Sequence, residues 1–183
     1  LVIAVSQSGT TADTNRTVDL VRARGAAVIS IVNRRNSDLV YKSDGVLYTS
    51  DGRDVEMSVA STKAFYCQVV GGYLLGLDLA RRLGTLSEGE VARRVTELAR
   101  LPDLMREVLA DAETVRVLAE RHAPQKRYWA VVGSGPTKVA ADEIRIKLSE
   151  LCYKSVACDT IEDKKHIDLS SEPLVLVCTA GLS

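Results

Sequence analysis

The chain has 183 residues, 46% of them hydrophobic, so it is long enough to bury a core as one domain or two small ones. Lysine plus arginine and aspartate plus glutamate both total 24, and no arginine-rich stripe is interleaved with aromatic residues, which argues against a nucleic-acid partner. The apolar stretch 59–83 is broken by Lys63, Asp78 and two arginines, so it does not predict a membrane span, and no signal segment opens the chain. We therefore expect a cytoplasmic protein.

Alternating strands and helices are predicted in the first part of the chain. Leu1 to Val5 is a continuous apolar run, typical of a strand buried in a parallel sheet. A Ser/Gly/Thr-rich turn follows it, and then a helix from Ala12 to Arg24 that ends at Gly25. The same rules predict, in chain order, strands at 27–32 and 45–50, a largely apolar helix at 59–83 that is either core or interface, and a helix opened by a capping box at Ser87 and Glu90.

A further helix is expected from about Asp103 to Arg121, and a second part that repeats the strand–turn–helix order begins after it. Its predicted elements are a strand at 128–132, a turn at 133–136, a helix at 137–151, and strands at 155–158 and 174–178. This order predicts an α/β protein with two related halves. We expect residues 1–122, with the helical connection, to form the first half and residues 123–183 the second, both of them cut at the ends of the chain.

The four cysteines show no C-x-x-C spacing and sit in apolar stretches, which predicts reduced thiols that pack as small buried hydrophobes. They are Cys67, Cys152, Cys158 and Cys178. The histidines, cysteines and aspartates are not clustered at ligand spacing, so neither a metal nor an organic cofactor is expected.

The turn Ser6-Gln7-Ser8-Gly9-Thr10-Thr11 is the first candidate site. A turn between a parallel strand and a helix presents unpaired N–H groups and the positive end of the helix dipole, which together attract anions. Four hydroxyls and one amide in six residues can surround a phosphate without a lysine. The alternative is an ordinary turn with a serine or threonine helix cap. The second turn, Gly133 to Lys138, lacks the spacing of a nucleotide-binding loop and is interpreted as structural.

Glu143, Lys147 and Glu150 are spaced by four and three residues, which places them on one helix face. They are either a solvated face with an ion pair or a group of acid/base residues. His166, in the polar run that begins at Glu162, is either a surface residue or an acid or base active near neutral pH.

Taken together, these motifs resemble the isomerase domain of the glutamine:fructose-6-phosphate amidotransferase, or glucosamine-6-phosphate synthase, family, which is built from two sugar isomerase (SIS) subdomains. Three stretches carry the resemblance: Ser6 to Thr14, Glu56 with Val59 to Phe65, and Glu143 to His166. The resemblance implies an α/β fold of the SIS type, a three-layer αβα sandwich with parallel sheets (flavodoxin-like or Rossmann-like), with two truncated subdomains.

The resemblance also implies roles for individual residues. Those expected to hold the sugar phosphate and line the sugar are Ser6, Gln7, Ser8, Thr11, Glu56, Val59 and Ser61. Glu150 matches the base that moves a proton between C1 and C2, Lys147 belongs to the same catalytic pattern, and His166 matches the ring-opening histidine. In the family that histidine comes from a neighbouring subunit, so a homodimer is implied.

The implied activity is ring opening and aldose–ketose isomerisation of fructose 6-phosphate towards glucosamine 6-phosphate, with no cofactor and with a glutaminase domain elsewhere in a longer protein. Around His166 the family has glycines and a proline, whereas this chain has Glu162, Asp163, Ile167 and Asp168. That departure leaves open a SIS-type deglycase or isomerase for another phosphosugar. A phosphosugar-sensing module without catalysis is the non-enzyme alternative.

Overall fold

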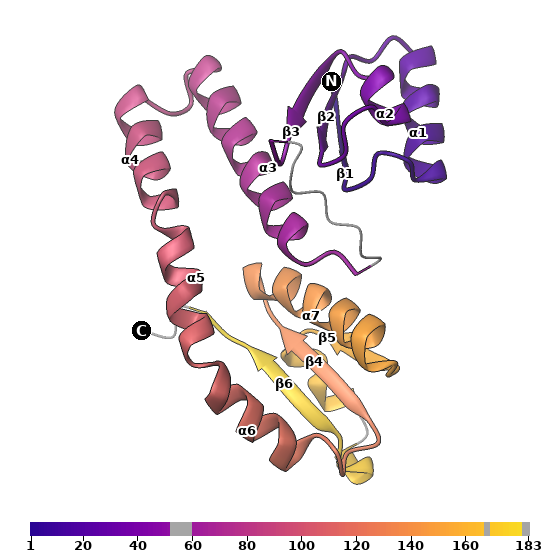
Figure 1. Cartoon of the computed structure of the whole chain (residues 1–183), viewed down its shortest axis with the longest axis vertical. Coiled ribbons are helices and arrows are strands. Elements are labelled where there is room, and N and C mark those ends of the chain that lie inside the picture. The colour runs from indigo at the N-terminus through magenta and orange to yellow at the C-terminus, as the bar shows by residue number, and fades with distance from the viewer. Residues whose placement is uncertain (52–59, 167–168, 181–183) are drawn as a thin grey trace. The chain divides into compact units, whose positions relative to one another are not determined.

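The computed structural model describes residues 1–51, 60–166 and 169–180. The chain forms two compact units, Leu1–Leu101 and Pro102–Ser183 (Figure 1). The boundary falls at the start of helix α5. The predicted division into SIS subdomains at residues 1–122 and 123–183 stays a prediction, and in the two compact units the helices after the boundary group with the C-terminal sheet.

The first unit is built on a three-stranded parallel sheet of order β1-β2-β3. Its elements are β1 (Val2–Ser6), α1 (Ala12–Ala23), β2 (Val28–Val32), α2 (Asp38–Tyr41), β3 (Gly45–Tyr48), α3 (Lys63–Arg82) and α4 (Glu88–Leu98). Because all three strands run the same way, the turns that follow them meet at one edge of the sheet. That edge positions the first candidate site.

Helices cover both faces of this sheet. On one face Ala4 and Val28 pack against Val18 of α1 and Leu39 of α2, and all four are buried. On the other face α3 approaches so closely that a Cβ on Gly71 would lie 3.2 Å from Cγ2 of Ile31. The alternation of side chains along a strand, which sends Val28 and Ile31 to opposite faces, therefore gives a three-layer arrangement.

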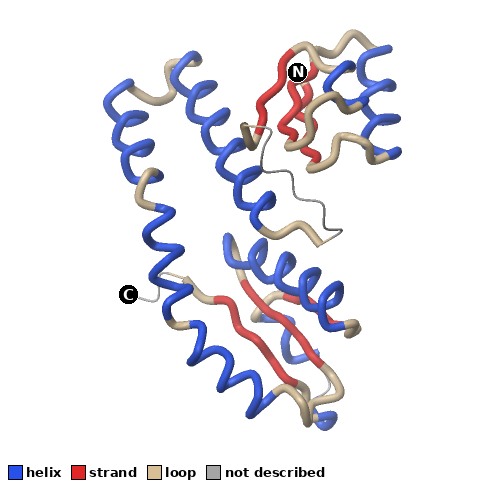
Figure 2. Tube along the Cα trace, in the orientation of Figure 1, coloured by secondary structure: helices blue, strands red, loops and turns tan. Residues whose placement is uncertain are grey.

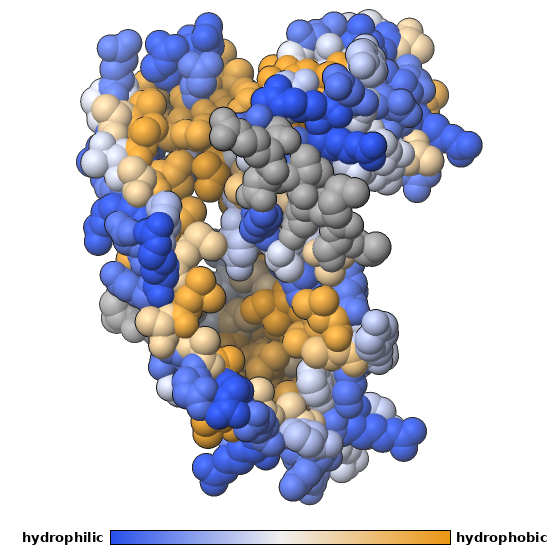
Figure 3. Space-filling model, in the orientation of Figure 1, coloured by the Kyte–Doolittle hydropathy of each residue, from blue (hydrophilic) through white to orange (hydrophobic). Residues whose placement is uncertain are grey.

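α3 and α4 form an antiparallel pair beside the sheet, and α4 opens with the predicted capping box. Ser87 Oγ accepts from the Glu90 N–H, while Glu90 accepts from the Ser87 N–H. α3 is buried only in part, since Leu75 is buried whereas Val69 is exposed. Figure 3 shows apolar residues gathered over α3 and α4.

The second unit has a parallel sheet of order β5-β4-β6, with α7 packed on one face. Its elements are α5 (Leu101–Ala110), α6 (Ala112–His122), β4 (Trp129–Gly133), α7 (Pro136–Cys152), β5 (Val156–Asp159), the 3-10 helices η1 (Glu162–His166) and η2 (Leu169–Ser171), and β6 (Leu174–Cys178). Figure 2 shows the helices and strands of each unit by colour. The core joins Val131 and Val156 of the sheet to Ala141 of α7.

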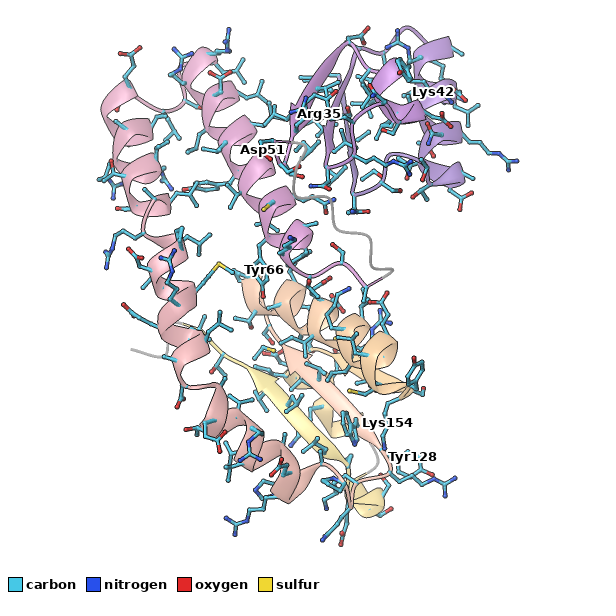
Figure 4. All side chains as sticks on the ribbon, viewed as in Figure 1. Arg35, Lys42, Asp51, Tyr66, Tyr128 and Lys154 are labelled. Atoms are coloured by element: carbon cyan, nitrogen blue, oxygen red, sulfur yellow. The ribbon has the colours of Figure 1, made fainter. Side chains whose placement is uncertain are left out.

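The start of β4 is fixed by polar contacts as well as by packing. The Trp129 indole N–H donates to the carbonyl of Lys126 at 2.9 Å. The ammonium group of Lys154, a residue labelled in Figure 4, lies 5.0 Å from the centre of the Trp129 ring. In the first unit Arg35 lies similarly over the ring of Tyr48, 4.2 Å from its centre, and holds the loop after β2 against β3.

Two sequence predictions need correction. The single helix expected at 103–121 is wrong, because the backbone of Asp111 (φ −93°, ψ 12°) leaves the helical conformation and separates α5 from α6. Two of the cysteines, Cys67 near the start of α3 and Cys152 at the end of α7, are exposed rather than buried. All four thiols are free, as expected.

Every predicted strand is present, within two residues at each end, and α2, η1 and η2 were not predicted. These three elements are at most five residues long, too short to show a hydrophobic period. Over the described residues, the helices fall short of the combined length and hydrophobicity that crossing a bilayer requires.

Candidate functional site

The hydroxyl-rich turn lies where the sequence predicts it, between the end of β1 and the start of α1. Ser6 is the last residue of the strand and is buried, whereas Thr10 and Thr11 are exposed. Gly9 has a φ of +66°, a left-handed conformation that costs a side-chain-bearing residue about 1–2 kcal/mol. The turn therefore leads from the core of the sheet to the surface within six residues.

The hydroxyl groups of two serines in the turn accept hydrogen bonds from other residues of the same turn. Ser6 Oγ accepts from the N–H of Gly9 at 3.0 Å. Ser8 Oγ accepts from the N–H of Thr10 at 3.3 Å and from its hydroxyl at 3.0 Å. In these bonds both serine oxygens act as acceptors, so each keeps a hydroxyl proton that can be donated to another group.

The carbonyl groups of the turn are held by donors of the surrounding protein. Gln7 O accepts from the N–H of Asn33 at 3.1 Å, and Gly9 O accepts from the N–H of Leu39 at 3.1 Å. The side-chain amide of Asn15 donates to the carbonyls of Gly9 and Thr11, both at 3.1 Å. Because these carbonyls are taken up internally, an approaching anion meets N–H and O–H groups.

Thr11 is the residue before α1, yet its side chain makes no capping hydrogen bond. The first-turn N–H groups of α1 have no acceptor inside the helix, and they lie at its positive end. The alternative of a conventionally capped turn is therefore not realised here. A helix N-terminus of this kind attracts anions.

A small pocket adjoins the turn at the same edge of the sheet. Its lining residues come from the ends of β2 and β3 and from the start of α3: Asn33, Thr49, Ser50, Lys63, Ala64 and Cys67. Asn33 is 3% exposed, its amide N–H₂ donates to Thr49 Oγ1 at 3.3 Å, and its Oδ1 has no partner among the described residues. A ligand with hydroxyl groups could supply the missing donor.

Asn15 and Asn33 were not predicted as site residues. Neither belongs to a recognisable motif, and each acts through a bond to a residue at least four positions away. An asparagine at the start of a helix, or just after a buried strand, is the only signal that the sequence offers for them.

The second candidate set lies on α7. The Lys147 ammonium is 2.8 Å from a Glu150 carboxylate oxygen and 3.5 Å from one of Glu143. The three side chains are only 20–34% exposed, which distinguishes them from an ordinary solvated ion pair. Burial by itself lowers the pKa of Lys147, but the bonds to Glu150 and Glu143 outweigh it and raise that pKa, so the side chain stays charged at neutral pH.

The remaining predicted residues are only partly described. Ser61 is half-buried, two residues before α3, and His166 is the last residue of η1, where the backbone alone is described. Glu56 and Val59 lie outside the described residues. The turn at Ser6–Thr11 belongs to the first unit, and the Glu143, Lys147 and Glu150 set belongs to the second.

No group of three or more histidine, cysteine, aspartate or glutamate side chains that could hold a metal ion is found in residues 1–51, 60–166 and 169–180. The described candidate positions offer hydroxyl and amide donors, two carboxylates and an ammonium group.

The first unit thus belongs to the class of parallel α/β domains, with a hydroxyl-rich turn after its first strand. Residues 1–77 match the model of the SIS domain family. The chain is 41% identical over 166 residues to the glutamine–fructose-6-phosphate aminotransferase (isomerizing) of Mycolicibacterium smegmatis, covering 91% of the chain and 26% of the relative. With the enzyme of that name from Caldanaerobacter subterraneus the identity is 37%, over 84% of the chain and 25% of the relative.

Among solved structures, the C-terminal domain of glucosamine-fructose-6-phosphate aminotransferase from Francisella tularensis matches with a TM-score of 0.87 and 28% identity, over 96% of this chain and 49% of that one. Glucosamine-6-phosphate deaminase from Thermotoga maritima shares the fold alone, with a TM-score of 0.69 and 16% identity over 96% of this chain and 51% of that one. The predicted resemblance and the predicted SIS-type fold are both confirmed. The chain spans about a quarter of the length of its curated relatives.

Proposed function

We propose that the chain is the sugar-phosphate isomerase domain of a glucosamine-6-phosphate synthase-like enzyme that binds fructose 6-phosphate. The observation that carries the proposal is the turn at Ser6–Thr11, whose hydroxyl protons, uncapped Thr11 and helix N-terminus are all available to one phosphate group. The names of the relatives that match over most of this chain support the choice of sugar.

In this proposal Ser6, Ser8 and Thr11 donate hydrogen bonds to the phosphate, and the side chain of Gln7 joins them. Neutral donors at a helix N-terminus bind a dianion without neutralising it fully, which favours binding that remains reversible. Glu56, Val59 and Ser61 line the sugar. The Asn33 pocket, at the same edge of the sheet, supplies an acceptor for a sugar hydroxyl.

The proposed reaction moves a proton between two adjacent carbons. His166 assists ring opening as an acid and base at the ring oxygen and the anomeric hydroxyl. The Glu150 carboxylate then removes a proton from C1 or C2 of the open sugar and returns it to the other carbon through an enediol or enamine. Lys147, which stays charged beside Glu150, stabilises the negative charge that develops on the neighbouring oxygen.

The assembly is part of the proposal as well. A homodimer supplies His166 from the neighbouring subunit, and a glutaminase domain in the whole protein supplies the ammonia for glucosamine 6-phosphate. A cytoplasmic location likewise stays a prediction.

A second candidate is an isomerase or deglycase for a different phosphosugar. The family has glycines and a proline around the histidine, and the specific observation behind this candidate is that Glu162 and Asp163 of this chain accept hydrogen bonds from the hydroxyls of Ser134 and Thr160. A differently held η1 would present His166 to a differently shaped sugar.

Calorimetric titration of the whole protein with fructose 6-phosphate, glucosamine 6-phosphate and inorganic phosphate tests the proposal. We expect both sugars to bind more tightly than phosphate. Thr11→Ala should weaken sugar-phosphate binding by about 10- to 100-fold, the worth of one hydrogen bond to a charged group. The melting temperature should hardly change, because Thr11 makes no capping bond that the variant would lose.

Thr17→Ala is the matched control, since Thr17 lies on the same helix and its hydroxyl donates to the carbonyl of Asp13 at 2.8 Å. It should bind the sugar phosphates like the unmodified protein. Equal affinities for Thr11→Ala and Thr17→Ala would contradict the phosphate site. Turnover of another phosphosugar without turnover of fructose 6-phosphate would favour the second candidate.

A further inference from the structure

We infer that Ser134 and Glu162 are positioning residues for His166: their side chains clamp the helix that ends at His166 onto the turn between β4 and α7. The inference rests on the proposed function, in which His166 opens the sugar ring. It adds two residues that neither the resemblance nor the sequence pattern assigns to this task.

The clamp consists of one hydroxyl that bonds two consecutive residues. Ser134 Oγ donates to a Glu162 carboxylate oxygen at 2.7 Å and accepts from the N–H of Ile161 at 3.2 Å. Along the chain, Ile161 is 27 positions and Glu162 is 28 positions away from Ser134. The two bonds hold the backbone of Ile161, just before η1, and the first side chain of η1 to a single hydroxyl group.

η1 also has an internal cap at its first turn. Thr160 Oγ1 accepts from the N–H of Asp163 at 3.1 Å and donates to the Asp163 carboxylate at 2.7 Å. This reciprocal pair fixes the entry of the chain into the helix. Because η1 is only five residues long, His166 lies just three positions beyond Asp163, the residue that this pair holds.

The point of attachment is itself rigid. Ser134 follows the buried strand β4, and the Thr137 side chain bridges its backbone, accepting from the Ser134 N–H at 3.1 Å and donating to the Ser134 carbonyl at 2.8 Å. A Cβ on Gly133 would lie 2.7 Å from the backbone carbonyl carbon of Thr137, so the turn is packed tightly against the start of α7. The clamp thus fixes the start of η1 relative to the sheet and to α7.

The charge of Glu162 suits this role. The bond from the Ser134 hydroxyl, together with the Glu162 backbone N–H, lowers the pKa of the Glu162 carboxyl, so it is ionised at neutral pH. Its carboxylate bonds the turn that leads into α7, near the positive end of that helix. In the second unit, the turn between β4 and α7 therefore binds the carboxylate of Glu162. In the first unit, we propose that the corresponding turn between β1 and α1 binds a phosphate.

Ser134→Ala in the whole protein is the decisive variant, read out by steady-state kinetics with fructose 6-phosphate and by amide hydrogen exchange. We expect faster exchange at residues 160–166 and a kcat lowered by about 10- to 100-fold, because a small displacement of a proton-transfer group is enough for such a loss. KM should change little, since the phosphate turn lies in the other unit. Ser134→Thr keeps the hydroxyl and should restore most of kcat.

Ser87→Ala is the matched control. Ser87 Oγ donates to a Glu90 carboxylate oxygen at 2.7 Å, the same bond at the same length, but at the start of α4. It should leave kcat and the exchange at residues 160–166 unchanged. Glu162→Ala removes the other half of the clamp at an exposed position, so it replaces Ser134→Ala should that variant fail to fold.

The His166→Ala variant distinguishes a failure of the proposed function from a failure of the positioning role. If it abolishes turnover while Ser134→Ala matches Ser87→Ala in kcat or in exchange, the proposed function stands and the positioning role is overturned. If it leaves turnover intact, the proposed role of His166 fails and the positioning role fails with it. The exchange at residues 160–166 then still reports whether the clamp itself exists.

Discussion

Gly9 and Ser37 approach so closely that a methyl group on Gly9 would lie 2.7 Å from Cβ of Ser37. The same methyl group would lie 3.1 Å from Cγ2 of Val32. Val32 and Ser37 are buried, with Val32 in the sheet and Ser37 just before α2, so neither can move aside cheaply. Only glycine fits at the centre of the proposed phosphate turn, for steric as well as conformational reasons.

Gly9→Ala should therefore deform the turn and abolish measurable sugar-phosphate binding. The control is Gly25→Ala, because Gly25 also has a positive φ, +79°, while a Cβ there would meet nothing within 4 Å. Gly25→Ala should cost about 1–2 kcal/mol of unfolding free energy and leave binding intact. Urea denaturation and phosphate titration of both variants check this, and normal binding by Gly9→Ala would contradict it.

Asn15→Ala should lower the free energy of unfolding by about 1–2 kcal/mol and weaken phosphate binding at the same time. The variant deletes the two amide bonds to the carbonyls of Gly9 and Thr11, each worth about 1 kcal/mol. Both carbonyls keep a second, backbone donor, so the turn loosens rather than unfolds. Thr17→Ala, on the same helix, serves again as the control. A loss of stability without any loss of affinity would show that Asn15 does not support the site.

Glu150→Gln should lower kcat for sugar isomerisation by about 10²–10⁴-fold, the usual worth of a general base, while sugar-phosphate affinity is retained. The amide keeps the shape of the carboxyl and can still accept from Lys147, so the melting temperature should change little. Glu97→Gln is a matched control, since Glu97 pairs with Arg93 at 3.0 Å on the exposed face of α4. Comparable kcat values for the two variants would remove Glu150 from the mechanism.

The thiols should differ in their rates of alkylation. Burial, and then the bond to Asp142, raise the pKa of Cys158, which lies near Lys138 with an Nζ to Sγ distance of 3.6 Å. A thiol with a raised pKa contains less of the reactive thiolate at a given pH. We expect iodoacetamide at about pH 8 to label the exposed Cys67 and Cys152 before Cys158.

The effect of the Lys138 charge on the pKa of Cys158 can be tested as well. Lys138 lowers the pKa of this thiol, so Lys138→Met should raise the pKa further and slow the labelling of Cys158. The rates at Cys67 and Cys152, followed by mass spectrometry in the same sample, provide the reference. Faster labelling of Cys158 in the variant would contradict the electrostatic account.

The local features of the fold follow from the sequence because their signals lie within one turn or one strand. The apolar run that becomes β1, the capping box of Ser87 and Glu90, and the helix-ending Gly25 each act on residues a few positions away. The break at Asp111 was missed because the helical pattern continues on both sides of it, and the short α2 and η1 carry no periodic signal.

The sequence by itself determined the class of domain and the position of the hydroxyl-rich turn where we propose that phosphate binds, since hydroxyl density after a buried strand is a contiguous pattern. Only the tertiary structure decided how the turn and η1 are held. Asn33 reaches Thr49 and Ser134 reaches Glu162 across 16 and 28 positions. Such partners are chosen by the register of parallel strands, which brings distant turns to one edge of a sheet, and no local pattern encodes that register.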